Sequence, residues 1–293
     1  MTNTTAPRKI LIGLIGKSIQ QSLTPSMQEE EARQQGLHLH YQLIDLDSTG
    51  AGVEDLPALL KAIRAIGFTG FNVTFPCKQA IIPLLDDLSE EARAMGAVNT
   101  VVNQNGKLIG HNTDGSGWSW GFQRALPHAD LSKVVLLGGG GAGSAIADAA
   151  LRIGVKHLTV VDLDTARTQA LADRLNSQHG VGRVTASTDI AAALRGASGL
   201  IHATPTGMDK LPGLPLPAEL LRADLWVSEV VYFPLETALL KTARALGCPT
   251  SDGGGMAVGQ AVGAFELFTG IHPDVARIDA HFRSMVAART AKA

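Results

Sequence analysis

A glycine-rich stretch between two apolar runs constrains the fold of this chain more than any other feature. Residues 134–137 are apolar, a cluster of glycines follows, and a second apolar run over 158–161 ends in Asp162. This order predicts a buried strand, a tight turn, a helix and a second, parallel strand. Glycines in such a turn let backbone N–H groups approach a pyrophosphate at the helix N-terminus, where the partial charge is positive. The pattern therefore predicts a Rossmann-type domain that binds a dinucleotide.

The turn itself supplies the expected cofactor contacts. Gly138 permits the tight turn, Gly140 leaves room for the phosphates, and Gly143 lets the helix pack closely against the sheet. A glycine turn can also serve only to join a strand to a helix, but the flanking apolar runs and the acid at the expected spacing favour nucleotide binding. The residues assigned to the cofactor in this turn are Gly138, Gly139, Gly140, Gly141, Ala142 and Gly143.

Asp162 predicts which dinucleotide is bound. A carboxylate at the end of the second strand accepts hydrogen bonds from the ribose hydroxyls of NAD, but it repels the 2′-phosphate of NADP. At about 4 Å and an effective dielectric of about 20, this repulsion is worth up to about 4 kcal/mol per unit charge. No basic residue directly follows Asp162, and Arg167 is expected to face solvent from the next helix. The sequence therefore favours NAD.

Length and composition exclude several other classes of protein. A chain of 293 residues can form two domains, and a net charge of −2 with 4% aromatic residues argues against a nucleic-acid surface. No apolar run is as long as a membrane span, and the short run after Arg8 is expected to be a strand rather than a signal peptide. Cys77 and Cys248 lack metal or redox spacing, so free thiols and a cytoplasmic location are expected. His38 and His40 lack a third ligand, so no metal site is expected.

Strand-like and helix-like segments also alternate ahead of the glycine turn. Five of them are 10–15, 25–35, 38–44, 56–66 and 70–75. The Asn105-Gly106 pair between two further apolar segments predicts a β-hairpin. The chain is therefore predicted to be an α/β protein of two domains. An N-terminal α/β substrate domain would cover 1–115 and be completed by the C-terminal helix within 254–293, and a Rossmann domain would cover 116–253.

Polar residues follow apolar runs at several separated places, and strand ends are where ligands bind in α/β folds. Each piece is weak alone, because a single lysine is usually solvated and Ser or Thr before Pro usually caps a helix. The pieces are Gly13-Leu-Ile-Gly16, Ser22-Leu-Thr24-Pro25, Asn72-Val-Thr74-Phe-Pro76-Cys-Lys78, Gly96-Ala-Val-Asn99-Thr, Gly110-His-Asn-Thr-Asp114-Gly, Ala203-Thr-Pro-Thr-Gly-Met208, Val231-Tyr232-Phe-Pro and Gly255-Met-Ala-Val-Gly-Gln260-Ala. In this order and spacing, together with the glycine turn, they resemble the shikimate dehydrogenase family over nearly the whole chain.

The resemblance implies a substrate domain facing the Rossmann domain across a cleft. It implies reversible hydride transfer between NAD and the C3 hydroxyl of shikimate or quinate, with Lys78 and Asp114 as the catalytic pair. The implied substrate-binding residues are Ser22, Thr24, Thr74, Asn99, Tyr232 and Gln260, and the further cofactor contacts are Thr204, Pro205 and Gly255. The expected partner is this small-molecule substrate, with no nucleic acid and no membrane, and the expected state is a monomer or homodimer.

Lys78 and Asp114 suit the chemistry that the resemblance implies. Oxidising an alcohol requires a group that accepts the hydroxyl proton, and positive charge near the developing alkoxide. Lys78 can do both if desolvation lowers its pKa, whereas a neighbouring Asp114 favours the charged amine. Which of the two accepts the proton first stays open, and we expect them to act as a coupled pair.

Departures from the family's usual residues leave the substrate open. Gln21, Thr24 and Glu229 stand where His, Ser and Asp are more common. The first two could shift the preference among shikimate, quinate and amino-substituted analogues, and Glu229 could matter only for its loop. The stretch that begins at Val161 is more similar to the NAD-using quinate/shikimate branch. The alternatives are a paralogue acting on a related acid such as aminoshikimate, and a catalytically silent NAD-binding module, which would have no use for the Lys78 and Asp114 pair.

Overall fold

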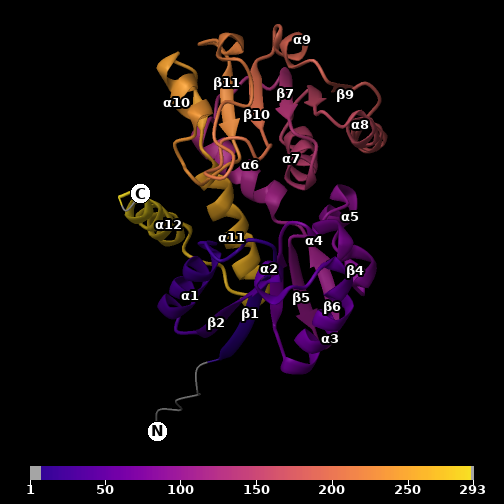
Figure 1. Cartoon of the computed structure of the whole chain (residues 1–293), viewed down its shortest axis with the longest axis vertical. Helices are drawn as coiled ribbons and strands as arrows, with labels where there is room; N and C mark the ends of the chain where they lie inside the picture. Colours follow the sequence, from indigo (N-terminus) through magenta and orange to yellow (C-terminus); the bar gives the residue numbers. More distant parts are fainter. Residues whose placement is uncertain (1–7, 292–293) are drawn as a thin grey trace. The chain divides into compact units, whose positions relative to one another are not determined.

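The computed structural model describes residues 8–291. Within them the chain forms two compact units, each with its own six-stranded sheet (Figure 1). The first unit comprises the residues up to Thr113 together with Ala261–Met285. The second comprises Asp114–Gln260 together with the residues from Val286 onward. The α/β class expected from the sequence is confirmed.

The first unit has a mixed sheet in the order β2-β1-β3-β5-β6-β4. Its strands are β1 (Lys9–Gly16), β2 (His38–Asp45), β3 (Gly70–Val73), β4 (Asp87–Leu88), β5 (Thr100–Gln104) and β6 (Lys107–His111). Strands β1, β2 and β3 are parallel, and β5 is antiparallel to both β3 and β6. The turn between β5 and β6 has positive φ at Asn105 (54°) and Gly106 (90°), which is the hairpin geometry that an Asn-Gly pair favours.

Helices cover both faces of this sheet. They are α1 (Thr24–Gln34), α2 (Leu46–Thr49), α3 (Leu56–Ile66), α4 (Cys77–Ala80) and α5 (Glu90–Met95), with short 3₁₀ turns at Val53–Asp55 and Ile82–Leu84. Helix α3 has apolar residues at helical spacing, so Leu56, Leu60 and Ile63 are buried on one face with Phe71. Helix α3 is followed by Gly67, whose φ of 90° suits glycine.

The second unit has an entirely parallel sheet in the order β12-β11-β10-β7-β8-β9. Its strands are β7 (Lys133–Leu137), β8 (His157–Val161), β9 (Val184–Ser187), β10 (Gly199–His202), β11 (Trp226–Glu229) and β12 (Thr250–Ser251). Its helices are α6 (Asp114–Ala125), α7 (Gly141–Arg152), α8 (Thr165–His179), α9 (Ile190–Leu194) and α10 (Ala238–Ala245), with a 3₁₀ turn at Ala218–Leu220.

Alternate residues of strand β7 enter two different cores. Val134 and Leu136 pack with residues of α6, α7 and α8, whereas Val135 packs with residues of α9 and α10. This alternation follows from the two-residue period of a strand, and it explains why β7 is apolar at every position between its ends. A sheet buried on both faces leaves its strand ends as the places where ligands can reach it.

Helix α11 (Gly253–Thr269) is divided between the two units, and α12 (Val275–Thr290) follows it. In the second unit, a Cβ on Gly121 of α6 would lie 2.6 Å from the carbonyl carbon of Gly255, so these two helices meet without side chains between them. The later part of α11 contributes Phe268 to the first unit's core. Arg289 lies over the ring of Phe233, 5.3 Å from its centroid. Residues 254–260 and the end of α12 thus make contacts within the second unit, and the later part of α11 contacts the first.

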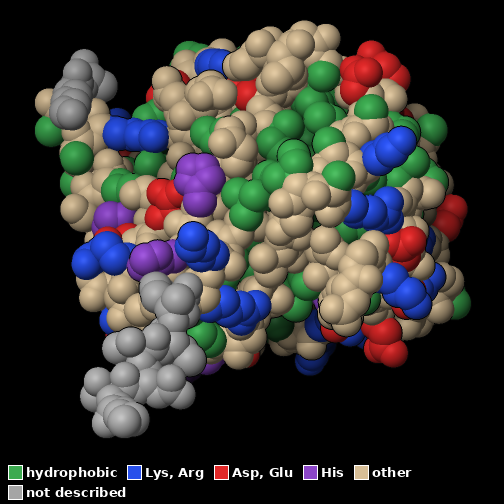
Figure 2. Space-filling view, turned by 90° about the horizontal axis from the view of Figure 1, so that it is seen from below, with side chains coloured by type: hydrophobic (Ala, Val, Ile, Leu, Met, Phe, Trp, Pro, Cys, Tyr) green, Lys and Arg blue, Asp and Glu red, His purple; other side chains and the backbone are tan. Residues whose placement is uncertain are grey.

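Surface features of the described residues are unremarkable. On the face that Figure 2 draws, Lys and Arg side chains gather with His side chains on the left, acidic side chains are scattered, and hydrophobic side chains lie together in the upper middle. Among the helices of residues 8–291, none combines the length and the apolar character needed to cross a membrane. Cys77 and Cys248 are buried free thiols.

Candidate functional site

The glycine turn of the second unit has the geometry that a dinucleotide requires. Gly138 has a φ of 107°, and a Cβ on it would lie 2.8 Å from the carbonyl oxygen of Ala203. A Cβ on Gly143 would meet the carbonyl oxygen of Gly138, so α7 approaches the turn as closely as it does only because this residue is glycine. A Cβ on Gly140 would meet only open space. Its lack of a side chain therefore serves nothing within the unit and leaves room for a ligand at the start of α7.

Asp162 lies beside this turn at the end of β8. Its Oδ2 accepts a hydrogen bond from the N–H of Gly139 at 2.7 Å, and its Oδ1 accepts from the N–H of Asp164 at 3.1 Å and from Arg167 at 2.9 Å. Partial burial alone would raise the pKa of Asp162, but these three hydrogen bonds and the charge of Arg167 outweigh burial and hold the pKa below its ordinary value. The side chain is therefore an anion at neutral pH, in contact with the backbone of the turn.

Arg167 makes a contact that the sequence did not predict. It is exposed, as expected, with half of its side chain in solvent, but its guanidinium also pairs with Asp162. The cause is the cap of α8, where the side chain of Asp164 accepts a hydrogen bond from the N–H of Arg167 and fixes the first turn of the helix. A residue in that first turn can direct its side chain back to the strand that precedes the helix. A cation therefore stands next to the acid that was expected to exclude a phosphate.

Two further loops follow the carboxyl ends of strands in the second unit's sheet, as the glycine turn does. Thr204 follows β10, and its Cγ2 would lie 3.0 Å from a Cβ on Gly138, so this loop borders the glycine turn. Pro205, next along it, is exposed. Tyr232 follows β11, where burial raises the pKa of its phenol, Arg289 partly offsets the rise, and Asp114 adds to it. Thr204 and the glycine turn are thus brought together, as the sequence predicts for parallel strand ends.

The first unit places several of the other predicted residues at strand ends. Thr74 directly follows β3, and its methyl group occupies the space where Gly16, at the end of β1, lacks a side chain. Lys78 lies in the short helix α4 just beyond, partly buried. Ser22 and Thr24 lie at the start of α1, where the Ser22 hydroxyl accepts a hydrogen bond from the N–H of Thr24 at 3.3 Å.

Asn99 joins two segments of the first unit. It is buried, its side-chain oxygen accepts from the N–H of Thr113 at 2.8 Å, and its amide donates to the Thr113 hydroxyl at 3.0 Å. The next residue, Asp114, begins α6 and is buried. Asn99 therefore holds the segment that leads directly into Asp114, a role that its motif alone did not reveal.

The two predicted residues of α11 differ in what the structure shows of them. Gly255 is required by packing, because a Cβ on it would lie 2.8 Å from the Cα of Gly121. Gln260 is partly buried, and its backbone N–H lies 2.5 Å from where Gly117 would carry a Cβ. The close packing of α11 on α6 is thus sufficient to require glycine at position 255. The same packing involves only the backbone of Gln260, so it does not account for the glutamine side chain.

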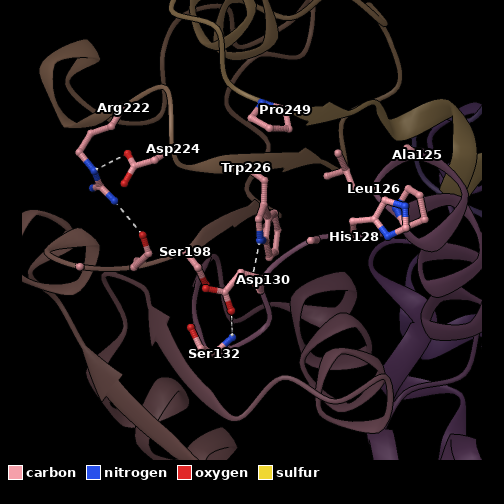
Figure 3. Close-up of a pocket in the computed structure, with 14 residues that line it drawn as sticks. Ala125, Leu126, His128, Asp130, Ser132, Ser198, Arg222, Asp224, Trp226 and Pro249 are labelled. Atoms are coloured by element: carbon pink, nitrogen blue, oxygen red, sulfur yellow. Dashed lines mark hydrogen bonds and ion pairs between the residues drawn. The ribbon is translucent and has the colours of Figure 1, made fainter.

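A pocket of the second unit lies at the amino-terminal ends of its strands, opposite the ends that carry the glycine turn (Figure 3). It has a volume of about 590 Å³, and Asp130, Ser198 and Trp226 are among its lining residues. Its polar groups are engaged within the protein: Trp226 donates to the carbonyl of Asp130, and Arg222 donates to two carbonyls and to Asp224. None of the predicted site residues lines it. Within residues 8–291, no three His, Cys, Asp or Glu side chains are grouped to hold a metal ion.

The fold and the glycine turn define an α/β protein with a Rossmann-type dinucleotide-binding unit. Comparison with known proteins gives the family. The family described as the shikimate dehydrogenase substrate binding domain matches residues 14–101, and the shikimate 5′-dehydrogenase C-terminal domain matches residues 253–280. The chain belongs to the shikimate dehydrogenase family, which confirms the expected family and the expected class of oxidoreductase.

Similar proteins differ in the cofactor that their names carry. A shikimate dehydrogenase (NADP(+)) of Streptomyces avermitilis is 55% identical over 270 residues, which cover 92% of this chain and 93% of the relative. A quinate/shikimate dehydrogenase (NAD(+)) of Corynebacterium glutamicum (strain R) is 48% identical, covering 94% and 99%. A solved structure of quinate dehydrogenase from Corynebacterium glutamicum in complex with NAD superimposes with a TM-score of 0.90 at 48% identity, covering 94% and 99%.

Proposed function

We propose that this protein is an NAD-dependent shikimate/quinate dehydrogenase, which transfers hydride reversibly between NAD and the C3 hydroxyl of shikimate or quinate. The observation that carries the choice of cofactor is the contact between the Asp162 carboxylate and the N–H of Gly139. It fixes an anion at the place where the adenosine ribose of a dinucleotide bound to this turn would lie. The relative whose solved structure holds NAD supports the same choice.

The pair formed by Asp162 and Arg167 determines how strict the choice can be. The lowered pKa keeps Asp162 anionic, so it accepts hydrogen bonds from ribose hydroxyls and repels a 2′-phosphate. Arg167 offsets part of this repulsion, because its guanidinium touches the same carboxylate. If a third of the full repulsion between Asp162 and the 2′-phosphate remains, NAD is preferred over NADP about tenfold. We expect a preference of that size rather than absolute selectivity for NAD.

The proposed chemistry uses Lys78 and Asp114. Bound NAD supplies the hydride acceptor. Lys78 accepts or holds the hydroxyl proton and stabilises the developing alkoxide, and Asp114 orients the amine and sets its protonation as part of a coupled pair. The substrate's hydroxyls and carboxylate would be held by the polar side chains of Ser22, Thr24, Thr74, Asn99, Tyr232 and Gln260. Thr24 carries a methyl group that serine lacks, which narrows the space for the substrate.

Steady-state kinetics test this proposal. We expect kcat/KM to be higher with NAD than with NADP for shikimate or quinate, and the ratio of the two acids to identify the preferred substrate. Lys78→Ala should lower kcat far more than it raises KM, whereas Lys61→Ala, which removes an exposed lysine of the same unit, should leave both unchanged. Binding of NAD without hydride transfer to or from any such acid would indicate the silent module, and a clear preference for an amino-substituted acid would indicate the paralogue.

A further inference from the structure

A histidine and a glutamate lie buried side by side at the carboxyl ends of two neighbouring inner strands of the second unit's sheet. His202 is the last residue of β10 and Glu229 the last of β11, and the two are direct partners in the register of these parallel strands. Both side chains are completely buried, with His202 Nδ1 2.8 Å from Glu229 Oε1. Burying two ionisable groups costs free energy unless each of their polar atoms has a hydrogen-bond partner. The partners of the two side chains therefore indicate which parts of the protein the pair holds in place.

Each member of the pair also binds the loop that follows its own strand. His202 Nε2 lies 2.5 Å from the hydroxyl of Thr204. Glu229 Oε1 accepts hydrogen bonds from the N–H groups of Val230 and Val231 at 2.9 and 3.0 Å. Its other oxygen accepts from the hydroxyl of Thr237 at 2.9 Å, and this residue caps α10. Every polar atom of the two side chains therefore has a partner.

The partners indicate which ring nitrogen carries a hydrogen. The oxygens of a carboxylate only accept, and Oε1 of Glu229 accepts from the N–H groups of Val230 and Val231, so in this arrangement Nδ1 of His202 is the donor to Oε1. In the neutral ring, Nε2 is then an acceptor, and the Thr204 hydroxyl donates to it. That leaves the Thr204 oxygen free to accept from the N–H of Thr206, which lies 3.3 Å away. The rotamer of Thr204, and with it the start of the loop, is set by the buried pair.

The two loops lie where the second half of a dinucleotide must pass. The acid that suits the adenosine ribose is at the end of β8, and the glycine turn follows β7. In the strand order β11-β10-β7-β8, an extended dinucleotide that starts over β8 and crosses β7 continues toward β10 and β11. The loop after β10 contains Thr204, and the loop after β11 contains Tyr232.

We propose that His202 and Glu229 are positioning residues that set the loops after β10 and β11, and thereby the nicotinamide end of the cofactor site. The inference rests on the proposed function for the identity of the cofactor. It follows that disturbing the pair weakens binding of the nicotinamide half and leaves binding of the adenosine half unchanged. A merely structural role would affect both halves equally, through overall stability.

Calorimetric titration of the full chain with ADP and with NAD tests this. For His202→Gln, we expect the Kd for NAD to rise about tenfold, corresponding to one lost hydrogen bond, and the Kd for ADP to stay within about twofold of the original. The matched control is His179→Gln, which breaks a bond of 2.7 Å between His179 and the buried Asp148 without touching either loop. It should lower the Tm and leave both Kd values unchanged.

Equal changes for ADP and NAD, or none for either, would overturn the proposal. Should His202→Gln fail to fold, Glu229→Gln, which keeps the length of the side chain and weakens its bond to the His202 ring, should give the same split between ADP and NAD. The binding assay does not depend on turnover. A wild-type chain that binds NAD without transferring hydride would therefore refute the proposed function and still decide the role of this pair.

Discussion

Two carboxylates at strand ends of one sheet show how similar geometry serves different purposes. Asp162 follows β8 and Glu229 ends β11, and both accept hydrogen bonds from backbone N–H groups. The Asp162 side chain is 14% exposed and pairs with the half-exposed Arg167, whereas Glu229 is completely buried and pairs with His202. Exposure leaves Asp162 able to accept a further hydrogen bond from a ligand. Burial commits Glu229 to the protein, so it can act on a ligand only through the loops that it holds.

The largest effect that we expect comes from neither carboxylate. Lys78→Ala should lower kcat by about 10²–10⁴-fold, the usual contribution of a positioned acid–base group. The measurement is single-turnover hydride transfer followed by the absorbance of the reduced nicotinamide. The loss of kcat in this variant is the size of effect expected for a residue that takes part in the chemistry. An equal loss of kcat with unchanged KM in an Asp162 or Glu229 variant would contradict the assignment of Asp162 to cofactor binding and of Glu229 to positioning.

The comparison predicts unequal losses of stability. Glu229→Ala leaves His202 and two backbone N–H groups without their acceptor in a buried site, so we expect the free energy of unfolding to fall by about 3–5 kcal/mol. Asp162→Ala removes a partly exposed pair and should cost less than about 1 kcal/mol. Urea denaturation followed by circular dichroism measures both. Equal losses would show that exposure does not separate the two sites.

Cofactor preference should respond in the opposite order. Asp162→Asn keeps the acceptor for Gly139 but removes the charge, so we expect the NADP/NAD ratio of kcat/KM to rise about tenfold. Glu229→Gln should leave that ratio unchanged, because its site is remote from the 2′-position of the ribose along the strand order. A ratio unaffected by Asp162→Asn would remove the basis for proposing NAD.

The smallest effect concerns acid stability. The folded-state pKa of Asp162 lies below its ordinary value of 3.8, because its hydrogen bonds and Arg167 outweigh partial burial. The group therefore stabilises the fold fully above the unfolded pKa, and this contribution is lost as pH falls through the lowered folded pKa. Asp162→Asn should flatten the dependence of the free energy of unfolding on pH in that acidic window. An unchanged slope would contradict the lowered pKa.

Much of the fold could be predicted because it depends on local pattern. The glycine turn, the apolar runs and the hairpin at Asn105-Gly106 each specify backbone geometry within a few residues. The helix expected over 56–66 has those bounds, and the strand expected over 70–75 ends two residues earlier, at Val73. The family resemblance then supplied the order of the pieces.

Side-chain pairing was less predictable because it depends on register between segments. His202 and Glu229 are 27 residues apart, and only the parallel pairing of β10 with β11 brings them together. Glu229 was noted as a departure from the family pattern, but nothing in its neighbourhood pointed to a histidine. The ion pair of the exposed Arg167 with Asp162 was missed for a related reason, since the helix cap at Asp164 determines the direction of that side chain.

The division of helix α11 has a consequence for the order in which the chain is completed on the ribosome. The first unit's core needs Phe268 beside Ile10 and Ile12, and Arg277 of α12 binds the buried Glu31 through two hydrogen bonds. Residues 114–260, which form most of the second unit, leave the exit tunnel before these segments do. The unit that begins first during translation is therefore still incomplete when most of the second unit has emerged, and its apolar surface stays uncovered during that interval.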